Sequence, residues 1–92
     1  MTYKEFNKEI KKLGLVCDYS YFFVSVYHST HNSYQLAYMS LEMANRMTTT
    51  SEISRLPENV GKKVLTLCYK LARTPLDERG ELEWLIKNLK KK

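Results

Sequence analysis

Two stretches of aromatic and β-branched residues, at positions 19–27 and 34–38, constrain the fold of this chain more than any other feature. A polar cluster at positions 29–33 separates them and is typical of a turn. Together they predict a β-hairpin with strands over about residues 20–28 and 34–41. Alternation along the strands predicts an apolar core face made of Phe22, Val24, Val26, Ala37, Met39 and Leu41. The opposite face takes the remaining positions: Tyr21, Phe23, Ser25, Tyr27, Tyr34, Leu36 and Tyr38.

Helical signals flank this hairpin. Thr2 and Glu5 have the spacing of a capping box, and apolar residues on one helical face predict a helix over residues 3–13 that ends at Gly14. A second apolar stripe predicts the main core helix over residues 57–73, with Pro57 at its first position. Between the two helices, Leu15 begins an extended stretch, a short further strand is expected at 43–48, and a helical piece is expected at 51–55.

The residues after the core helix predict one more helix. Pro75 disfavours helical geometry at Thr74, so the core helix should stop there, and Thr74 can then cap a new helix. An apolar stripe follows in this new helix at Leu82, Leu85, Ile86 and Leu89. The predicted fold is a single α+β domain over residues 1–92. It has an N-terminal helix, an antiparallel β-meander of three or four strands, and two C-terminal helices packed mainly on one sheet face.

The composition and charge of the chain indicate its cellular location and the state of its cysteines. The longest apolar run is far shorter than the roughly 20 residues of a membrane helix, and the first residues lack the pattern of a signal peptide. We therefore expect a cytoplasmic protein that makes no membrane contact. Cys17 and Cys68 both lie in apolar patterns and are predicted to be buried free thiols. The net charge of +5 comes mainly from lysines in the helical flanks.

No group of residues predicts catalysis. His28 and His31 sit in a turn cluster without the further ligands that a zinc site needs, so no metal is expected. The carboxylates that follow Thr74 are explained by the start of a helix, where acidic side chains are favourable. Neither cysteine has the partners of a nucleophile, and there is no glycine-rich phosphate loop. The sequence predicts a protein that is not an enzyme and has no cofactor and no small-molecule substrate.

The tyrosine face is the main candidate for function, and three interpretations remain open. It can bind a protein partner, including a second copy of the chain, because tyrosine is enriched at interfaces. It can instead be covered by the C-terminal helix, with Trp84, Leu85 and Leu89. It can also stack bases of a single-stranded nucleic acid while nearby lysines hold phosphates. The lysines of this last interpretation are Lys8, Lys11, Lys12, Lys62 and Lys63.

The run Thr74-Pro-Leu-Asp-Glu-Arg79, with Leu56-Pro-Glu before it, resembles the C-terminal part of short proteins from phages and prophages of Gram-positive bacteria. The tail from Glu81 departs from that family, in which it is often richer in aromatic residues. The family is mostly of unknown function, so the resemblance implies a phage setting and no site residues. Small phage proteins often bind host proteins or nucleic acid, and anti-CRISPR inhibitors of host nucleases are one such class. A basic chain of this kind would have to block a surface, since it cannot imitate phosphate charge.

Overall fold

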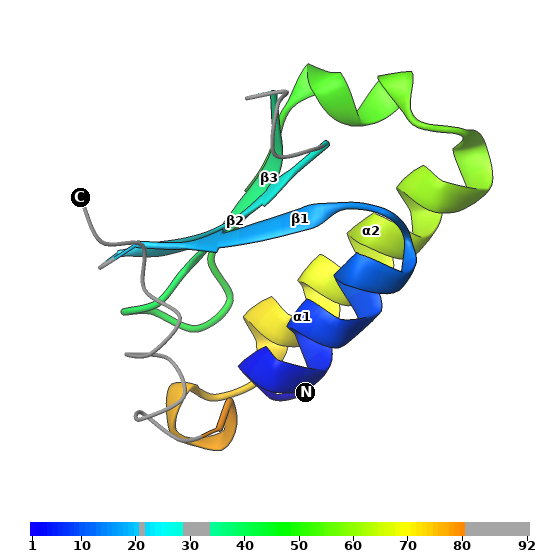
Figure 1. The fold of residues 1–92 in the computed structure, drawn as a ribbon. Helices are drawn as coiled ribbons and strands as arrows, with labels where there is room; N and C mark the ends of the chain where they lie inside the picture. Colours follow the sequence, from blue (N-terminus) through cyan, green and yellow to red (C-terminus); the bar gives the residue numbers. More distant parts are fainter. Residues whose placement is uncertain (21, 29–33, 81–92) are drawn as a thin grey trace.

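The computed structural model describes residues 1–20, 22–28 and 34–80 (Figure 1). Two α-helices, four strands and two 3-10 turns follow in the order α1 (Tyr3–Lys12), β1 (Val16–Tyr19), β2 (Phe23–Tyr27), β3 (Gln35–Ser40), β4 (Met47–Thr49), η1 (Ser51–Arg55), α2 (Glu58–Arg73) and η2 (Leu76–Glu78). The strands form one antiparallel meander in the order β1-β2-β3-β4. The predicted α+β class, the N-terminal helix and the antiparallel sheet are therefore confirmed.

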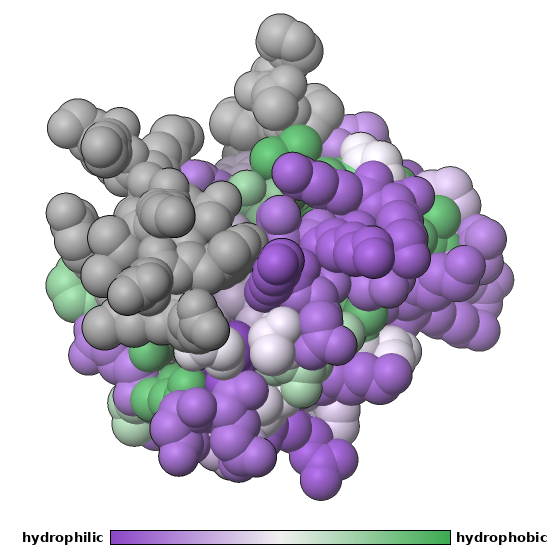
Figure 2. Space-filling view, turned by 60° about the horizontal axis from the view of Figure 1, so that its bottom comes forward, coloured by the Kyte–Doolittle hydropathy of each residue, from purple (hydrophilic) through white to green (hydrophobic). Residues whose placement is uncertain are grey.

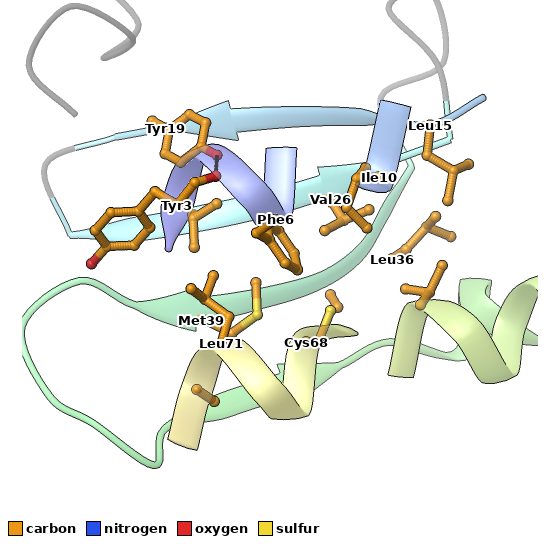
Figure 3. Close-up of a cluster of buried hydrophobic side chains, with 14 of the residues drawn as sticks. Tyr3, Phe6, Ile10, Leu15, Tyr19, Val26, Leu36, Met39, Cys68 and Leu71 are labelled. Atoms are coloured by element: carbon orange, nitrogen blue, oxygen red, sulfur yellow. Dashed lines mark hydrogen bonds between the residues drawn. The ribbon is translucent and has the colours of Figure 1, made fainter. Parts of the chain in front are cut away.

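Both helices lie against the same face of the sheet, so the molecule has a helix layer and a sheet layer (Figure 1). The cross-strand pairs Val24–Met39 and Val26–Ala37 place these four side chains on the face that meets the helices. One hydrophobic cluster fills the space between the layers (Figure 3). Its most deeply buried apolar side chains are Phe6, Ile10, Val24, Val26, Leu36, Met39, Val64, Cys68 and Leu71.

The ends of α1 form as the sequence predicts. The Thr2 side chain accepts a hydrogen bond from the Glu5 amide, and the Glu5 carboxylate accepts one from the Thr2 amide. Gly14 has a φ of +78° just after the helix, where its amide donates to the Lys11 carbonyl. A left-handed backbone conformation is strained for residues that carry a Cβ, so glycine suits this position just after the helix.

A β-bulge corrects the predicted pattern of β3. The strand pairing shifts between Val26 and Tyr27, so that Val26 faces Ala37 while Tyr27 faces Gln35. Leu36 is the extra residue, and it is fully buried in the core instead of sharing the tyrosine face. A bulge adds one residue to a strand and turns the following side chains, which simple alternation cannot anticipate.

The second C-terminal helix is not confirmed. Within the described residues after α2, only the short 3-10 turn η2 (Leu76–Glu78) is helical. Thr74 was predicted to cap a new helix, but it is the C-terminal cap of α2, where its hydroxyl donates to the Lys70 carbonyl and accepts from the Met1 amino group. The predicted stripe at 82–89 lies outside the described residues. None of the helices in the described ranges is long and apolar enough to cross a membrane.

Arg79, the last residue of the Thr-Pro-Leu-Asp-Glu-Arg run, is fully buried. Its guanidinium donates to the carbonyls of Ser40 (2.7 Å), Thr74 (2.9 Å) and Ala72 (3.1 Å). It also lies 5.8 Å from the centre of the Tyr3 ring, while the Arg79 carbonyl accepts from the Tyr3 amide at 2.6 Å. These contacts join the first turn of α1, the end of β3 and the end of α2 at one point. A buried cation is tolerable only when its donors are satisfied, as they are here.

Replacement of Arg79 should therefore damage the fold. Arg79→Met leaves three buried carbonyls without their donor, and each such loss costs about 1–3 kcal/mol. We expect the free energy of unfolding, measured with urea, to fall by about 3 kcal/mol or more. Arg79→Lys should also destabilise, since an ammonium group lacks the planar fork. The control Arg73→Met removes an exposed arginine and should cost under about 1 kcal/mol; equal losses for Arg73 and Arg79 would contradict the assignment.

Candidate functional site

The outer face of the sheet, which the helices leave open, is the candidate site. Strand register places on it the side chains that alternate with the core positions: Val16, Asp18, Phe23, Ser25, Tyr27, Gln35, Tyr38, Ser40 and Thr48. Near the middle of this face, the Gln35 amide donates to the Ser25 hydroxyl at 2.9 Å. This bond runs diagonally between β2 and β3, so the face is polar at its centre.

A groove lies at the end of this face where β2 begins and β3 ends. We call it the aromatic groove and define it by Phe22, Phe23, Tyr38 and Met43; its lining also includes Glu42 and Arg46. Its volume is about 550 Å³. Phe22, Phe23 and Met43 are 59%, 42% and 51% exposed, although all three are large apolar side chains. Contiguous apolar exposure is uncommon on a small monomer and is typical of a binding surface.

Local contacts hold the walls of the aromatic groove. The Phe23 ring meets the Tyr38 ring edge to face, with centres 5.2 Å apart and planes at 79°. The Phe22 carbonyl accepts from the Leu41 amide, which ties the start of β2 to the end of β3. The Ser40 hydroxyl accepts hydrogen bonds from the amides of Glu42 and Met43, and these bonds fix the turn that carries Met43. The groove is thus largely preformed.

The four predicted tyrosines do not form one cluster. Tyr38 lines the aromatic groove, while Tyr27 lies on the same face but on the other side of the Gln35–Ser25 bond. Tyr34 precedes β3 and is 50% exposed, with the Arg55 guanidinium 5.4 Å from its ring centre. Tyr21 lies outside the described residues. Of the three predicted tyrosines that the structure describes, only Tyr38 lines the groove with other exposed apolar side chains.

Sequence reasoning missed Phe22 and Met43. Alternation put Phe22 on the core face, but the residue precedes β2 in a bend and points to solvent. Met43 was placed in a short strand at 43–48, whereas the strand there is β4, Met47–Thr49, and residues 41–46 form a turn with Asn45 at φ +62°. The adjacent Phe22 and Phe23 were a usable signal, because neighbouring residues of an extended chain point to opposite sides and both cannot be buried by a two-layer fold.

The lysines named for phosphate contact lie in the other layer. Lys12 of α1 and Lys62 and Lys63 of α2 line a second groove, of about 460 Å³, between the two helices. We call it the helix groove. Lys8 and Lys11 are exposed on α1 but do not line it. Figure 2, which turns the helix side of the molecule forward, shows a mainly hydrophilic surface there. The sheet separates Tyr27 and Tyr38 from these lysines, so one bound strand cannot stack on the tyrosines and also lie in the helix groove.

The two cysteines behave as core residues. Cys68 is fully buried in α2, and Cys17 in β1 is partly buried on the core side; both are free thiols. Burial raises the pKa of Cys17 from 9.0 to about 12, with a smaller contribution from nearby Cys68. Burial also raises the pKa of Cys68 to about 12. Among the residues that the structure describes, no three metal-ligating side chains come together.

Comparisons of this chain with protein-family models, with curated proteins and with solved structures found no match. The resemblance to phage proteins therefore stays a prediction.

The burial of both thiols predicts that Cys17 and Cys68 react slowly with thiol reagents. Only the thiolate attacks a disulfide reagent, and a pKa raised from 9.0 to about 12 lowers the thiolate fraction near neutral pH by about 1,000-fold. We expect an aromatic disulfide reagent to label the native protein at least that much more slowly than a free thiol. The rate should rise with pH and become normal in denaturant. In Cys17→Ser, the remaining Cys68 should react more slowly still; rapid native labelling of Cys68 would contradict its burial.

Proposed function

We propose that this protein is a small non-enzymatic binding protein that acts through protein–protein contact at the aromatic groove. The observation that carries the proposal is the exposure of Phe22, Phe23 and Met43 around a preformed groove. Aromatic residues and methionine are enriched in the buried centre of protein interfaces. Glu42 and Arg46 also line the groove, and such interfaces combine an apolar centre with polar residues.

The charges on the sheet side favour a protein over a nucleic acid at this groove. The charged side chains in the lining of the aromatic groove are one acidic residue, Glu42, and one basic residue, Arg46. A phosphate backbone gains no net electrostatic attraction from a lining of zero net charge. A partner with its own apolar side chains would instead gain by desolvating Phe22, Phe23 and Met43.

The partner is either a second copy of the chain or a different protein, such as a host factor in the predicted phage setting. A groove bounded by fixed turns suits an inserted side chain or short segment of the partner. Tyr38 supplies a hydroxyl next to the apolar wall formed by Phe23, and this combination gives both contact area and a directional hydrogen bond.

Substitutions in the walls of the aromatic groove test the proposal. Phe22→Ser with Met43→Ser removes the two most exposed apolar walls and should weaken partner binding at least about tenfold, since central aromatic contacts are each worth about 2 kcal/mol or more. Stability should change little, because both side chains are exposed. Self-association is measured by light scattering over a range of protein concentrations, and capture of other proteins by the immobilised chain is measured by mass spectrometry.

A matched control uses exposed apolar residues of α2, Leu65→Ser with Tyr69→Ser, which are 40% and 55% exposed and line neither groove. The variant with this pair of substitutions should still self-associate and still capture other proteins. If the two pairs lose binding equally, general surface hydrophobicity is responsible and the proposed site is wrong. The pair Tyr27→Ser with Tyr38→Ser tests the wider face: loss of binding on folded protein extends the interface past the Gln35–Ser25 bond.

A further inference from the structure

The charge of the described part of the chain is divided between the two layers. Helices α1 and α2 carry eight basic side chains and three acidic ones, a net charge of +5. All the other described residues carry three basic and five acidic side chains, a net charge of −2. The sequence already places most lysines in the helical flanks, and the fold puts both helices in the layer opposite the aromatic groove.

The helix groove is the place where this charge comes from both helices at once. α1 and α2 run antiparallel, since the Met1 amino group bonds to Thr74 at the end of α2. The last turn of α1 therefore lies beside the first turns of α2. Lys12 on one wall faces Lys62 and Lys63 on the other, above the partly buried side chains of Leu13 and Leu67.

The acidic side chains near this groove do not neutralise it. Lys12 pairs with Glu9 at 3.4 Å and Lys62 pairs with Glu58 at 3.2 Å, but these are exposed pairs within single helices. Exposed pairs of this kind are worth only a few tenths of a kcal/mol, so an incoming anion can displace them. In the described residues, Lys63 makes no ion pair at all. The lining of the helix groove thus carries three lysines and one carboxylate, Glu9, and a surface with an excess of cations is complementary to a polyanion.

We propose that the helix groove binds the phosphate backbone of a nucleic acid without reading its sequence, and that duplex is preferred to single strand. None of the residues that line the groove is aromatic, so bases have no ring to stack on there. The attraction then depends on phosphate charge alone, and duplex DNA has the higher charge density. This site is independent of the aromatic groove, so one molecule can hold nucleic acid on its helix side and a protein on its sheet side.

The test compares two lysine pairs that remove the same charge. Lys12→Ala with Lys63→Ala takes one cation from each wall of the groove. Lys11→Ala with Lys70→Ala also takes one cation from each helix, but neither residue lines the groove. All four side chains are exposed, so circular dichroism and urea unfolding should show folded proteins of similar stability. Binding is measured by fluorescence anisotropy with a labelled mixed-sequence duplex of about 20 base pairs, and with one of its strands alone.

For the unaltered protein, duplex binding should be tighter than single-strand binding, and log affinity should fall linearly with log salt between about 50 and 200 mM. The Lys12/Lys63 variant should bind at least about tenfold more weakly at the lower salt, with a slope reduced by about 1.8 for two lost phosphate contacts. The Lys11/Lys70 variant should stay within about threefold of the unaltered protein. Phe22→Ser with Met43→Ser should bind the duplex normally, which separates this proposal from the proposed function.

Four results would overturn the proposal. The first is no binding of either nucleic acid at low salt. The second is an equal loss in both lysine pairs, which would make the attraction a property of total charge. The third is tighter binding of the single strand than of the duplex, together with weaker binding by Tyr38→Ser; this result would place the site on the sheet face. The fourth is equal competition by a polyglutamate peptide of the same charge, which would indicate an acidic protein as the partner.

Discussion

The guanidinium of Arg79 is the contact on which the arrangement of the elements depends. It donates to carbonyls at the ends of β3 and α2, and it packs against Tyr3 at the start of α1. Around it, the Tyr19 hydroxyl donates to the Tyr3 carbonyl, and the Tyr3 and Tyr19 rings meet edge to face (Figure 3). Because the donors reach both the end of β3 and the end of α2, a small shift of either element would leave a buried polar group unpaired. The free-energy cost of an unpaired buried polar group therefore holds this corner of the protein in one geometry.

That corner also determines where the candidate site lies. Ser40 offers its carbonyl to Arg79 and its hydroxyl to the turn that carries Met43. The amide of Asn45, in the same turn, donates to the Ala72 carbonyl, which also accepts from Arg79. The aromatic groove is therefore built on a segment that the core holds in place, even though its own side chains are exposed. A preformed groove loses less conformational entropy when a partner binds.

Local features of the structure were predictable where neighbours in sequence decide them. The Thr2–Glu5 capping box, the left-handed Gly14 and the burial of Cys68 in an apolar stripe all form as expected. Tyr27 and Tyr38 were correctly placed on the outer face by alternation. The errors fall where a local pattern is interrupted: at the bulge that buries Leu36, at the bend that exposes Phe22, and after Thr74, where the described residues form only the short 3-10 turn η2. In each case a tertiary contact outweighs a local preference.

The sequence by itself determined the class of the fold, because periodic apolar patterns and capping residues act over a few positions. It also determined that positive charge would lie on helices, since the lysines occur there. Only the tertiary structure decided that Arg79 is buried, that Phe22 and Met43 share a groove with Tyr38, and that the lysines and tyrosines named for one site lie in different layers. The physical reason is that these arrangements depend on contacts between residues far apart in the chain, and such contacts leave no periodic trace in the sequence.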